Sequence, residues 1–314
     1  MKRILRRNLV QTLLCGAAGV PQSKAAAGPF FSRRIDEMTS REVESYINDG
    51  GDLVLIPFGP VSGHGPFIPM GMHAHWANAL SVLLAEKANG LVFPATFTCF
   101  AGATRTFRGT VSFTMEEQIL VLKRIASTLH AAGFKRTVLV AGTNPEDVGG
   151  IIAARALFDE TEVPYYYLQG SRILDQPEIK AMYAGYPGNF GETVIELASL
   201  RILGRERPIP VPNWTREAKP ANNSDQPPEI AEDMRQMKRV GAVGWRYFEE
   251  KHHGGSGTAG MMFRGKSDID LAVQVLHKCA ELALPALQSF SHYQKWLADH
   301  PMEYIRAKDR LEEK

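Results

Sequence analysis

The sequence predicts a three-layer α/β/α sandwich with a mostly parallel central sheet. Short apolar runs of the length of a buried strand alternate with longer segments that have helical periodicity. Strands that are apolar on both faces are typical of a parallel sheet covered by helices on each side. The 314 residues, of which 44% are hydrophobic, are enough for one large α/β domain.

Four segments have the pattern of buried strands: Leu53–Ile56, Leu91–Pro94, Thr137–Val140 and Val163–Leu168. Each is short, apolar and bounded by residues that favour turns, such as the proline that follows Ile56. The second, third and fourth strands each follow a segment of helical length. This order predicts crossover connections and therefore parallel pairing.

Six segments have the periodicity or the end signals of helices. The first expected helix begins after a cap at Thr39 or Ser40, and Gly133 ends the third. The longest expected helix is apolar over much of its length, so it is expected to cover one face of the sheet. The six expected helices are Asp36–Ile47, Ala74–Ala88, Met115–Ala132, Val148–Glu160, Glu192–Leu203 and Ile269–Phe290.

Residues 1–27 have the composition of an export signal. Basic residues precede an apolar run from Leu9 to Val20, and three alanines at 25–27 offer a cleavage site. The pair Arg6-Arg7 resembles a twin-arginine signal, which predicts a periplasmic or exported protein. The alternative is an amphipathic N-terminal helix on a cytoplasmic protein. Residues 28–314 are then expected to form a single domain, with a long polar and proline-rich excursion at about 205–233.

Charge and cysteine content narrow the class of function. The net charge of +2 and the lack of a basic block predict neither a nucleic-acid partner nor a membrane partner. The three cysteines have no CxxC spacing, so neither a disulfide framework nor a thiolate zinc site is expected. A small-molecule substrate or ligand is the expected partner.

The segment most informative about function follows the first strand. It reads PFGPVSGHGPFIPMGMH from Pro57 to His73, a loop rich in glycine and proline that contains a histidine. Loops at strand ends are where α/β proteins place their chemistry. Three further segments follow in order: FRGTVS at 107–112, VLVAGTNPED at 138–147 and NFGETVIE at 189–196.

In their order and spacing, these four segments resemble those of the creatininase (creatinine amidohydrolase) family. In that family the first segment reads like P-V-G-S-T-E-Q-H-G-P-H-L-P-L-G-T-D, and it aligns with residues 57–73 without a gap. The resemblance implies the family's α/β sandwich, hydrolysis of a cyclic or linear amide at a site with two metal ions, and a homo-oligomer, a hexamer in that family.

Compared with the family, the first segment has lost two metal ligands. Ser62 replaces the family's glutamate, His64 keeps the histidine, and His73 replaces the aspartate that bridges the two ions. An imidazole can bind one ion but bridges two poorly, because its two nitrogens point in different directions.

The later segments are altered as well. Thr143 replaces the family's histidine in the third segment, where a carboxylate follows at Glu146 or Asp147. In the fourth segment Asn189 replaces a histidine, and Glu192 keeps a glutamate. The resemblance therefore implies a rebuilt site.

The remaining ligands predict at most one metal ion. Two divalent ions carry about four positive charges, which several carboxylates must offset because burying uncompensated charge is costly. Two imidazoles and one carboxylate form a common catalytic zinc set, so one zinc or manganese ion on His64, His73 and Glu192 is expected, and a metal-free site is the alternative.

Two functions follow from this site. The first is a creatininase-like hydrolase of an amide C–N bond, in which His64 and Glu192 are catalytic. Side chains that could then bind the substrate are Ser62, Thr143, Asn144, Asn189 and Arg108. The second is a non-catalytic protein of the same fold that binds a small molecule or serves as a subunit of an assembly.

Overall fold

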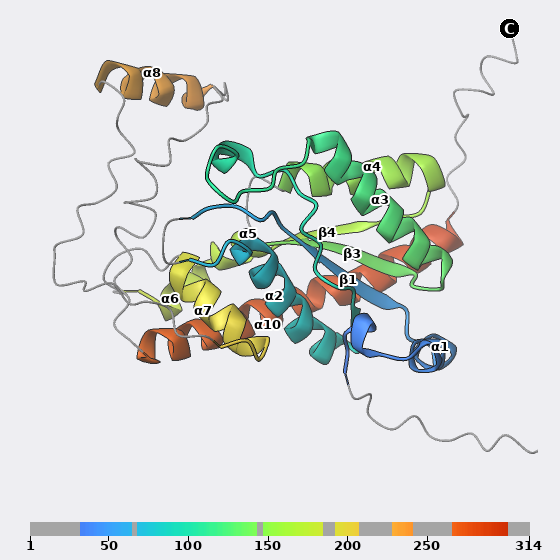
Figure 1. The fold of residues 1–314 in the computed structure, drawn as a ribbon. Coiled ribbons are helices and arrows are strands. Elements are labelled where there is room, and N and C mark those ends of the chain that lie inside the picture. The colour runs from blue at the N-terminus through green and yellow to red at the C-terminus, as the bar shows by residue number, and fades with distance from the viewer. Residues whose placement is uncertain are drawn as a thin grey trace, which may run out of the picture. The chain divides into compact units, whose positions relative to one another are not determined.

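The computed structural model describes residues 32–64, 68–142, 147–184, 192–206, 228–240 and 266–300. A four-stranded sheet lies at its centre, in the order β2-β1-β3-β4 (Figure 1). The strands are β1 (Leu53–Phe58), β2 (Leu91–Val92), β3 (Arg136–Ala141) and β4 (Tyr166–Gln169). All three strand pairs are parallel, which confirms the predicted parallel sheet.

The strand register brings the ends of three strands to one edge of the sheet. Phe58, the last residue of β1, pairs with Ala141, the last residue of β3. Ala141 in turn pairs with Gln169, the last residue of β4. The loops that follow these strands therefore start side by side, as expected for the carboxyl edge of a parallel sheet.

Helices and short 3-10 turns make up the rest of the described chain. They are η1 (Ile35–Glu37), α1 (Ser40–Asn48), α2 (Met72–Ala88), η2 (Gly102–Thr104), α3 (Met115–Ala131), α4 (Asp147–Thr161), α5 (Gly170–Leu174), α6 (Pro177–Met182), α7 (Glu192–Ile202), α8 (Pro228–Arg239) and α10 (Lys266–Asp299). None of the described helices is both long and apolar enough to cross a membrane.

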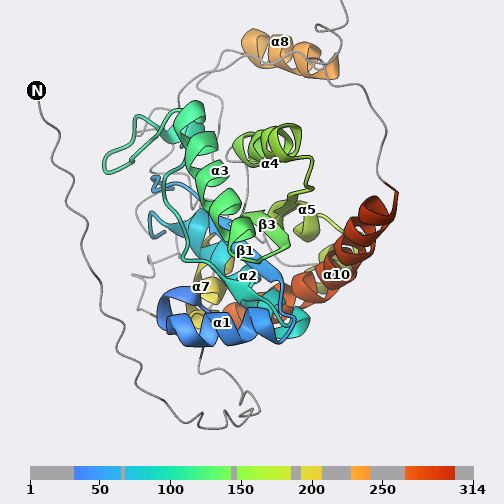
Figure 2. The ribbon, with the colours of Figure 1, turned by 90° about the vertical axis from the view of Figure 1, so that its right-hand side faces the viewer.

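Two hydrophobic cores lie on opposite faces of the sheet. Alternate residues of each strand point to opposite faces, so Leu55 and Val138 enter one core while Ile56 and Leu139 enter the other. The first core is covered by α2, α7 and α10, and the second by α3 and α4 (Figures 1 and 2). This arrangement confirms the predicted three-layer sandwich.

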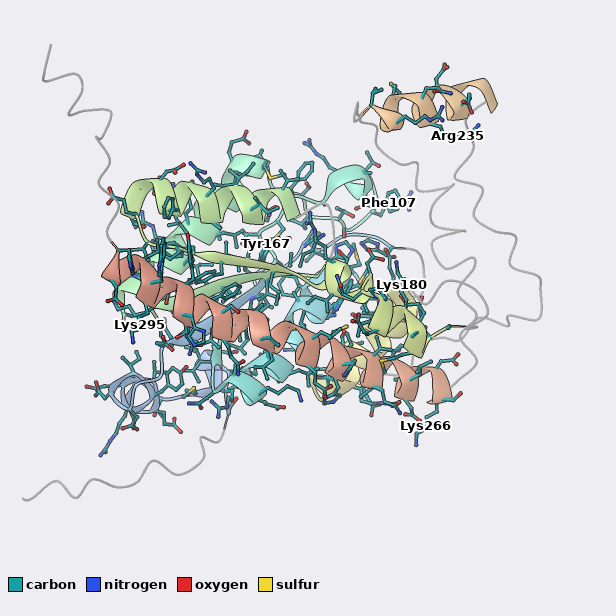
Figure 3. The ribbon with its side chains drawn as sticks, turned by 180° about the vertical axis from the view of Figure 1, so that it is seen from behind. Phe107, Tyr167, Lys180, Arg235, Lys266 and Lys295 are labelled. Atoms are coloured by element: carbon teal, nitrogen blue, oxygen red, sulfur yellow. The ribbon has the colours of Figure 1, made fainter. Side chains whose placement is uncertain are left out.

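The long helix α10 covers the face that it shares with α2 and α7. It runs from Lys266 past Lys295 along that side of the sheet (Figure 3). Its residue Phe290 stacks on Tyr166 of β4, with ring centroids 3.8 Å apart. The helix is longer at its C-terminal end than the apolar pattern predicted, because polar and charged residues continue it to Asp299.

The structure also differs from the predicted elements in its short helices and in the segment at 205–233. Helices α5 and α6 were not predicted, since five or six residues are too few to show a helical period. The predicted irregular excursion at 205–233 contains the start of α8, and residues 207–227 lie outside the described residues.

The helix α1 is capped by Thr39, whose hydroxyl accepts the Glu42 N–H while the Glu42 side chain accepts the Thr39 N–H.

The first turn of α2 lies unusually close to the ends of β1 and β3. A Cβ atom added to Gly59, after β1, would lie 2.5 Å from the Ala74 backbone nitrogen. A Cβ added to Gly142, after β3, would lie 2.5 Å from the His73 carbonyl oxygen. Glycine at both positions therefore lets the start of α2 approach the carboxyl edge of the sheet.

A buried pair of polar side chains joins α2 to α7. The Nδ1 atom of His75 lies 2.7 Å from Oε1 of Glu196, whose side chain is fully buried. Burial raises the pKa of Glu196, and the hydrogen bond from His75 opposes that rise. The second carboxylate oxygen has no hydrogen-bond partner among the described residues, so His75 is the main compensation for this buried group.

Replacing Gly142 by alanine should destabilise the protein by about 2 to 3 kcal/mol, because the methyl group must displace backbone of α2. Gly50→Ala is the control, since that position has a φ of +88° but open space around the added atom. It should cost only about 1 kcal/mol of backbone strain. Urea unfolding of the full chain measures both. Equal losses would mean that α2 does not press on the strand end.

Removing the partner of Glu196 should also be costly. His75→Ala leaves a buried carboxylate unpaired, and we expect a loss of about 3 kcal/mol in the free energy of unfolding at neutral pH. Glu196→Gln in the same chain should recover part of that loss, because the buried charge is gone. A double-mutant cycle by urea unfolding gives the coupling, and a coupling near zero would contradict an interaction between the two side chains.

Candidate functional site

Three potential metal ligands meet at the carboxyl edge of the sheet. His64 comes from the loop after β1, His73 from the first turn of α2, and Glu192 is the first residue of α7. One ligand atom from each lies within 4.8 Å of the other two. Within the described ranges, no other group of three or more histidine, cysteine or acidic side chains has this property.

His64 is at the centre of this cluster and contacts every other member. Its Nε2 atom lies 2.9 Å from the Ser62 hydroxyl oxygen, and its Nδ1 atom lies 3.3 Å from Oε2 of Glu192. Its ring packs against that of His73, with centroids 4.5 Å apart and planes tilted by 49°. We call Ser62, His64, His73 and Glu192 the His64 cluster.

Most of the His64 cluster is shielded from solvent. Ser62, His64 and His73 are 1%, 6% and 4% exposed, whereas the Glu192 side chain is 41% exposed. Glu192 is also in the first turn of α7, where the helix dipole favours a negative charge. The cluster therefore combines buried imidazoles with a partly exposed carboxylate at a helix N-terminus.

Backbone hydrogen bonds hold the loop that carries Ser62 and His64. The Ser62 N–H donates to the Met70 carbonyl oxygen (2.9 Å), and the Gly63 N–H donates to the Thr110 hydroxyl (3.0 Å). The Val111 N–H donates to the carbonyl oxygen of Val61 (2.9 Å). The segment 107–112, which sequence analysis singled out, therefore supports the loop from outside the cluster.

The donor set of the cluster fits one divalent metal ion. Two imidazoles and one carboxylate are a common ligand set for catalytic zinc, and the spacing of their donor atoms allows a shared ion. The Ser62 hydroxyl would then accept a hydrogen bond from the second ring nitrogen of His64, a typical outer contact of a metal-bound histidine.

The structure brings together four of the predicted site residues, namely Ser62, His64, His73 and Glu192. It leaves the Arg108 side chain exposed and does not place it in the cluster. The other predicted positions lie outside the described residues or have side chains that do: Thr143, Asn144, Glu146, Asp147 and Asn189.

Sequence reasoning missed the pair His75–Glu196 beside the cluster. His75 was not among the predicted site residues, yet its Nδ1 atom is bonded to a buried carboxylate. The charges of His73 and His64 help to lower the pKa of Glu196, so the carboxylate is within electrostatic reach of both. One feature of the sequence could have pointed to Glu196: it follows Glu192 by four residues, which puts both side chains on one face of α7.

A cavity of about 410 Å³ lies beside β4, and its lining residues differ from those of the His64 cluster. Its walls come from β4, α5, α6 and α10, with Ile151 of α4. None of the four cluster residues lines it.

Comparison with known proteins agrees with this fold. Residues 36–160 match the family model described as creatininase, creatinine amidohydrolase. No curated protein matches the chain in sequence.

Solved structures of creatininases have the same fold at low sequence identity. A creatininase with manganese superposes with a TM-score of 0.60 at 16% identity, covering 82% of this chain and 99% of that one. A creatininase variant in a zinc–zinc form gives 0.59 at 16% identity, covering 82% and 98%. A further creatinine amidohydrolase gives 0.57 at 17% identity, covering 82% and 99%.

The family signature covers residues 36–160, and the fold extends over most of the chain. The low identity agrees with the replaced ligand positions at Ser62 and His73. The chain is therefore similar to creatininases in sequence over residues 36–160 and in fold over most of its length.

Proposed function

We propose that this protein hydrolyses a C–N bond in a small cyclic or linear amide, and that the His64 cluster is its active site. The observation that carries the proposal is the convergence of His64, His73 and Glu192 at the carboxyl edge of the sheet. The family match over residues 36–160 supports the reaction class. The replaced ligand positions argue for a substrate other than creatinine.

If the site works without a metal ion, Glu192 or His64 serves as the general base. A buried imidazole beside a carboxylate can take a proton from an attacking oxygen and pass it to the leaving nitrogen. The adjacent ring of His73 excludes water from one side of His64. Ser62 lies within hydrogen-bonding distance of the same imidazole, so a substrate bound there would be close to both.

The proposal includes a site for one divalent ion, zinc or manganese, on His64, His73 and Glu192. The creatininases of similar fold include a manganese form and a zinc–zinc form. When bound, the ion would act as a Lewis acid toward the substrate carbonyl. One carboxylate in the cluster is too little negative charge for two ions.

The proposal also includes assembly into a homo-oligomer. Helix α4 exposes three apolar side chains, namely Val148, Ile151 and Ile152, which are 49%, 44% and 44% exposed. Apolar side chains close together on one helix are typical of a subunit contact.

Amide hydrolysis is tested with a panel of lactams, cyclic imides, creatinine and N-formyl amines. We expect the full chain to release the amine from at least one compound, and His64→Ala and Glu192→Gln to lower the rate by about 100-fold or more. Product amine is measured by mass spectrometry, with the chelator-treated protein and again with zinc or manganese added.

Glu86→Gln is the matched control, because Glu86 is exposed at the far end of α2. Its rate should equal that of the unchanged protein. Saturable binding of a panel compound without turnover would instead support the alternative, a non-catalytic binding protein.

Metal binding is tested by elemental analysis after incubation with zinc and removal of the free ion. We expect about one ion per chain in the unchanged protein, and a large loss in His64→Ala, His73→Ala and Glu192→Gln, because each removes one of three ligands. The control His292→Ala removes an exposed histidine of α10 and should keep the ion. Retention of zinc by all three cluster variants would place the ion elsewhere.

A further inference from the structure

We propose that Glu196, held in place by His75, supplies the second negative charge that a divalent ion on the His64 cluster requires. Glu196 would be a positioning residue of the metal site, outside the set of ligands. This role rests on the proposed function, because the ion belongs to that proposal. Neither Glu196 nor His75 is among the three side chains whose donor atoms lie close enough together to share an ion.

Glu196 is a buried acidic side chain that is only half satisfied by hydrogen bonds. It is 0% exposed, and Asp268 is the one other buried acid among the described residues. One carboxylate oxygen lies 2.7 Å from His75 Nδ1, which is the distance of a hydrogen bond between charged or polar groups. The other oxygen has no hydrogen-bond partner in the described part of the chain. A buried carboxylate needs more compensation than one such bond, so a positive charge nearby would explain its presence.

The two histidines of the cluster are close enough to act on Glu196 through their charge. Burial raises the pKa of Glu196, the hydrogen bond to His75 lowers it, and positive charge on His73 and His64 lowers it further. Interactions between charges are mutual. A cation held by the rings of His64 and His73 is therefore itself stabilised by the ionised Glu196 carboxylate.

A count of charges shows why the cluster needs a second carboxylate. A divalent ion carries two positive charges, and the cluster offers one carboxylate, Glu192, whose side chain is 41% exposed. Solvent weakens the effect of an exposed charge, whereas a buried charge acts through a medium of lower polarity. With ionised Glu196 the negative charges number two, which balances one divalent ion but not two. This agrees with the single ion of the proposed function.

The bond to His75 also fixes the turn of α2 that carries a ligand. His75 lies two residues after His73, and its backbone N–H donates to the Gly71 carbonyl oxygen (2.8 Å). Its ring covers Gly71, where an added Cβ atom would lie 2.9 Å from Nε2. The bond from Nδ1 to Glu196 then ties the turn that carries His73 to the helix that begins at Glu192. Groups outside the ligand set commonly orient metal ligands and tune the metal in this way.

The test is the zinc affinity of the full chain, measured by competition with a chromogenic chelator. We expect Glu196→Gln to weaken zinc binding by about 10- to 100-fold, because glutamine keeps the size and a hydrogen-bond acceptor but not the charge. Glu196→Asp keeps the charge and should bind zinc more tightly than Glu196→Gln. The absorption spectrum with cobalt in place of zinc should be the same in Glu196→Gln and the unchanged protein, because the ligand set is intact.

Two controls separate the loss of charge from damage to the fold. Ser199→Ala removes another buried polar group of α7, one that donates to the Ile195 carbonyl oxygen, and should leave zinc affinity unchanged. Urea unfolding of metal-free Glu196→Gln should occur at the same denaturant concentration as in the unchanged protein or higher, since a buried charge is gone.

The outcomes separate this role from the proposed function. If the unchanged chain takes up no zinc, the metal site and the role of Glu196 are both wrong. If zinc binds and is lost in His64→Ala, but Glu196→Gln binds it as tightly as the unchanged chain, only the role of Glu196 is wrong. Weaker binding with an altered cobalt spectrum would contradict the charge role, because the ligands themselves would have moved. Weaker zinc binding in Glu196→Gln without turnover of any panel amide would support this role and contradict C–N hydrolysis.

Discussion

The close approach of helix α2 to the carboxyl edge of the sheet brings the two histidines of the site together. Gly59 and Gly142 follow neighbouring strands, and neither position has room for a Cβ atom because the backbone of α2 occupies it. The first turn of the helix therefore places His73 against the strand ends. The loop after β1 must turn back toward that helix, and this brings His64 onto the ring of His73.

His64 links the members of the cluster, because each of its ring nitrogens faces a different group. Relative to the family, Ser62 stands where a carboxylate would be, which exchanges a charged metal ligand for a neutral hydroxyl. A hydroxyl cannot offset a metal charge, so this substitution lowers the negative charge available to a metal ion at the site.

The pair His75–Glu196 supports the site from the neighbouring turn of each helix. It joins α2 to α7, the two helices that supply His73 and Glu192. A fully buried carboxylate is costly, so its bond to His75 restricts how these helices can shift against each other. The sequence does not reveal this pair, because helical periodicity shows which way a side chain points but not which helix it meets.

The pattern of apolar runs was sufficient to predict the layers, the parallel sheet and most helices, since strand and helix periods are local properties of the chain. The family segments were sufficient to nominate Ser62, His64, His73 and Glu192. The sequence could not show that His64 lies beside Glu192, because this contact joins segments more than a hundred residues apart. The short helices α5 and α6 and the buried pair of His75 with Glu196 were also decided only by tertiary packing, which sets side-chain direction and burial through long-range contacts.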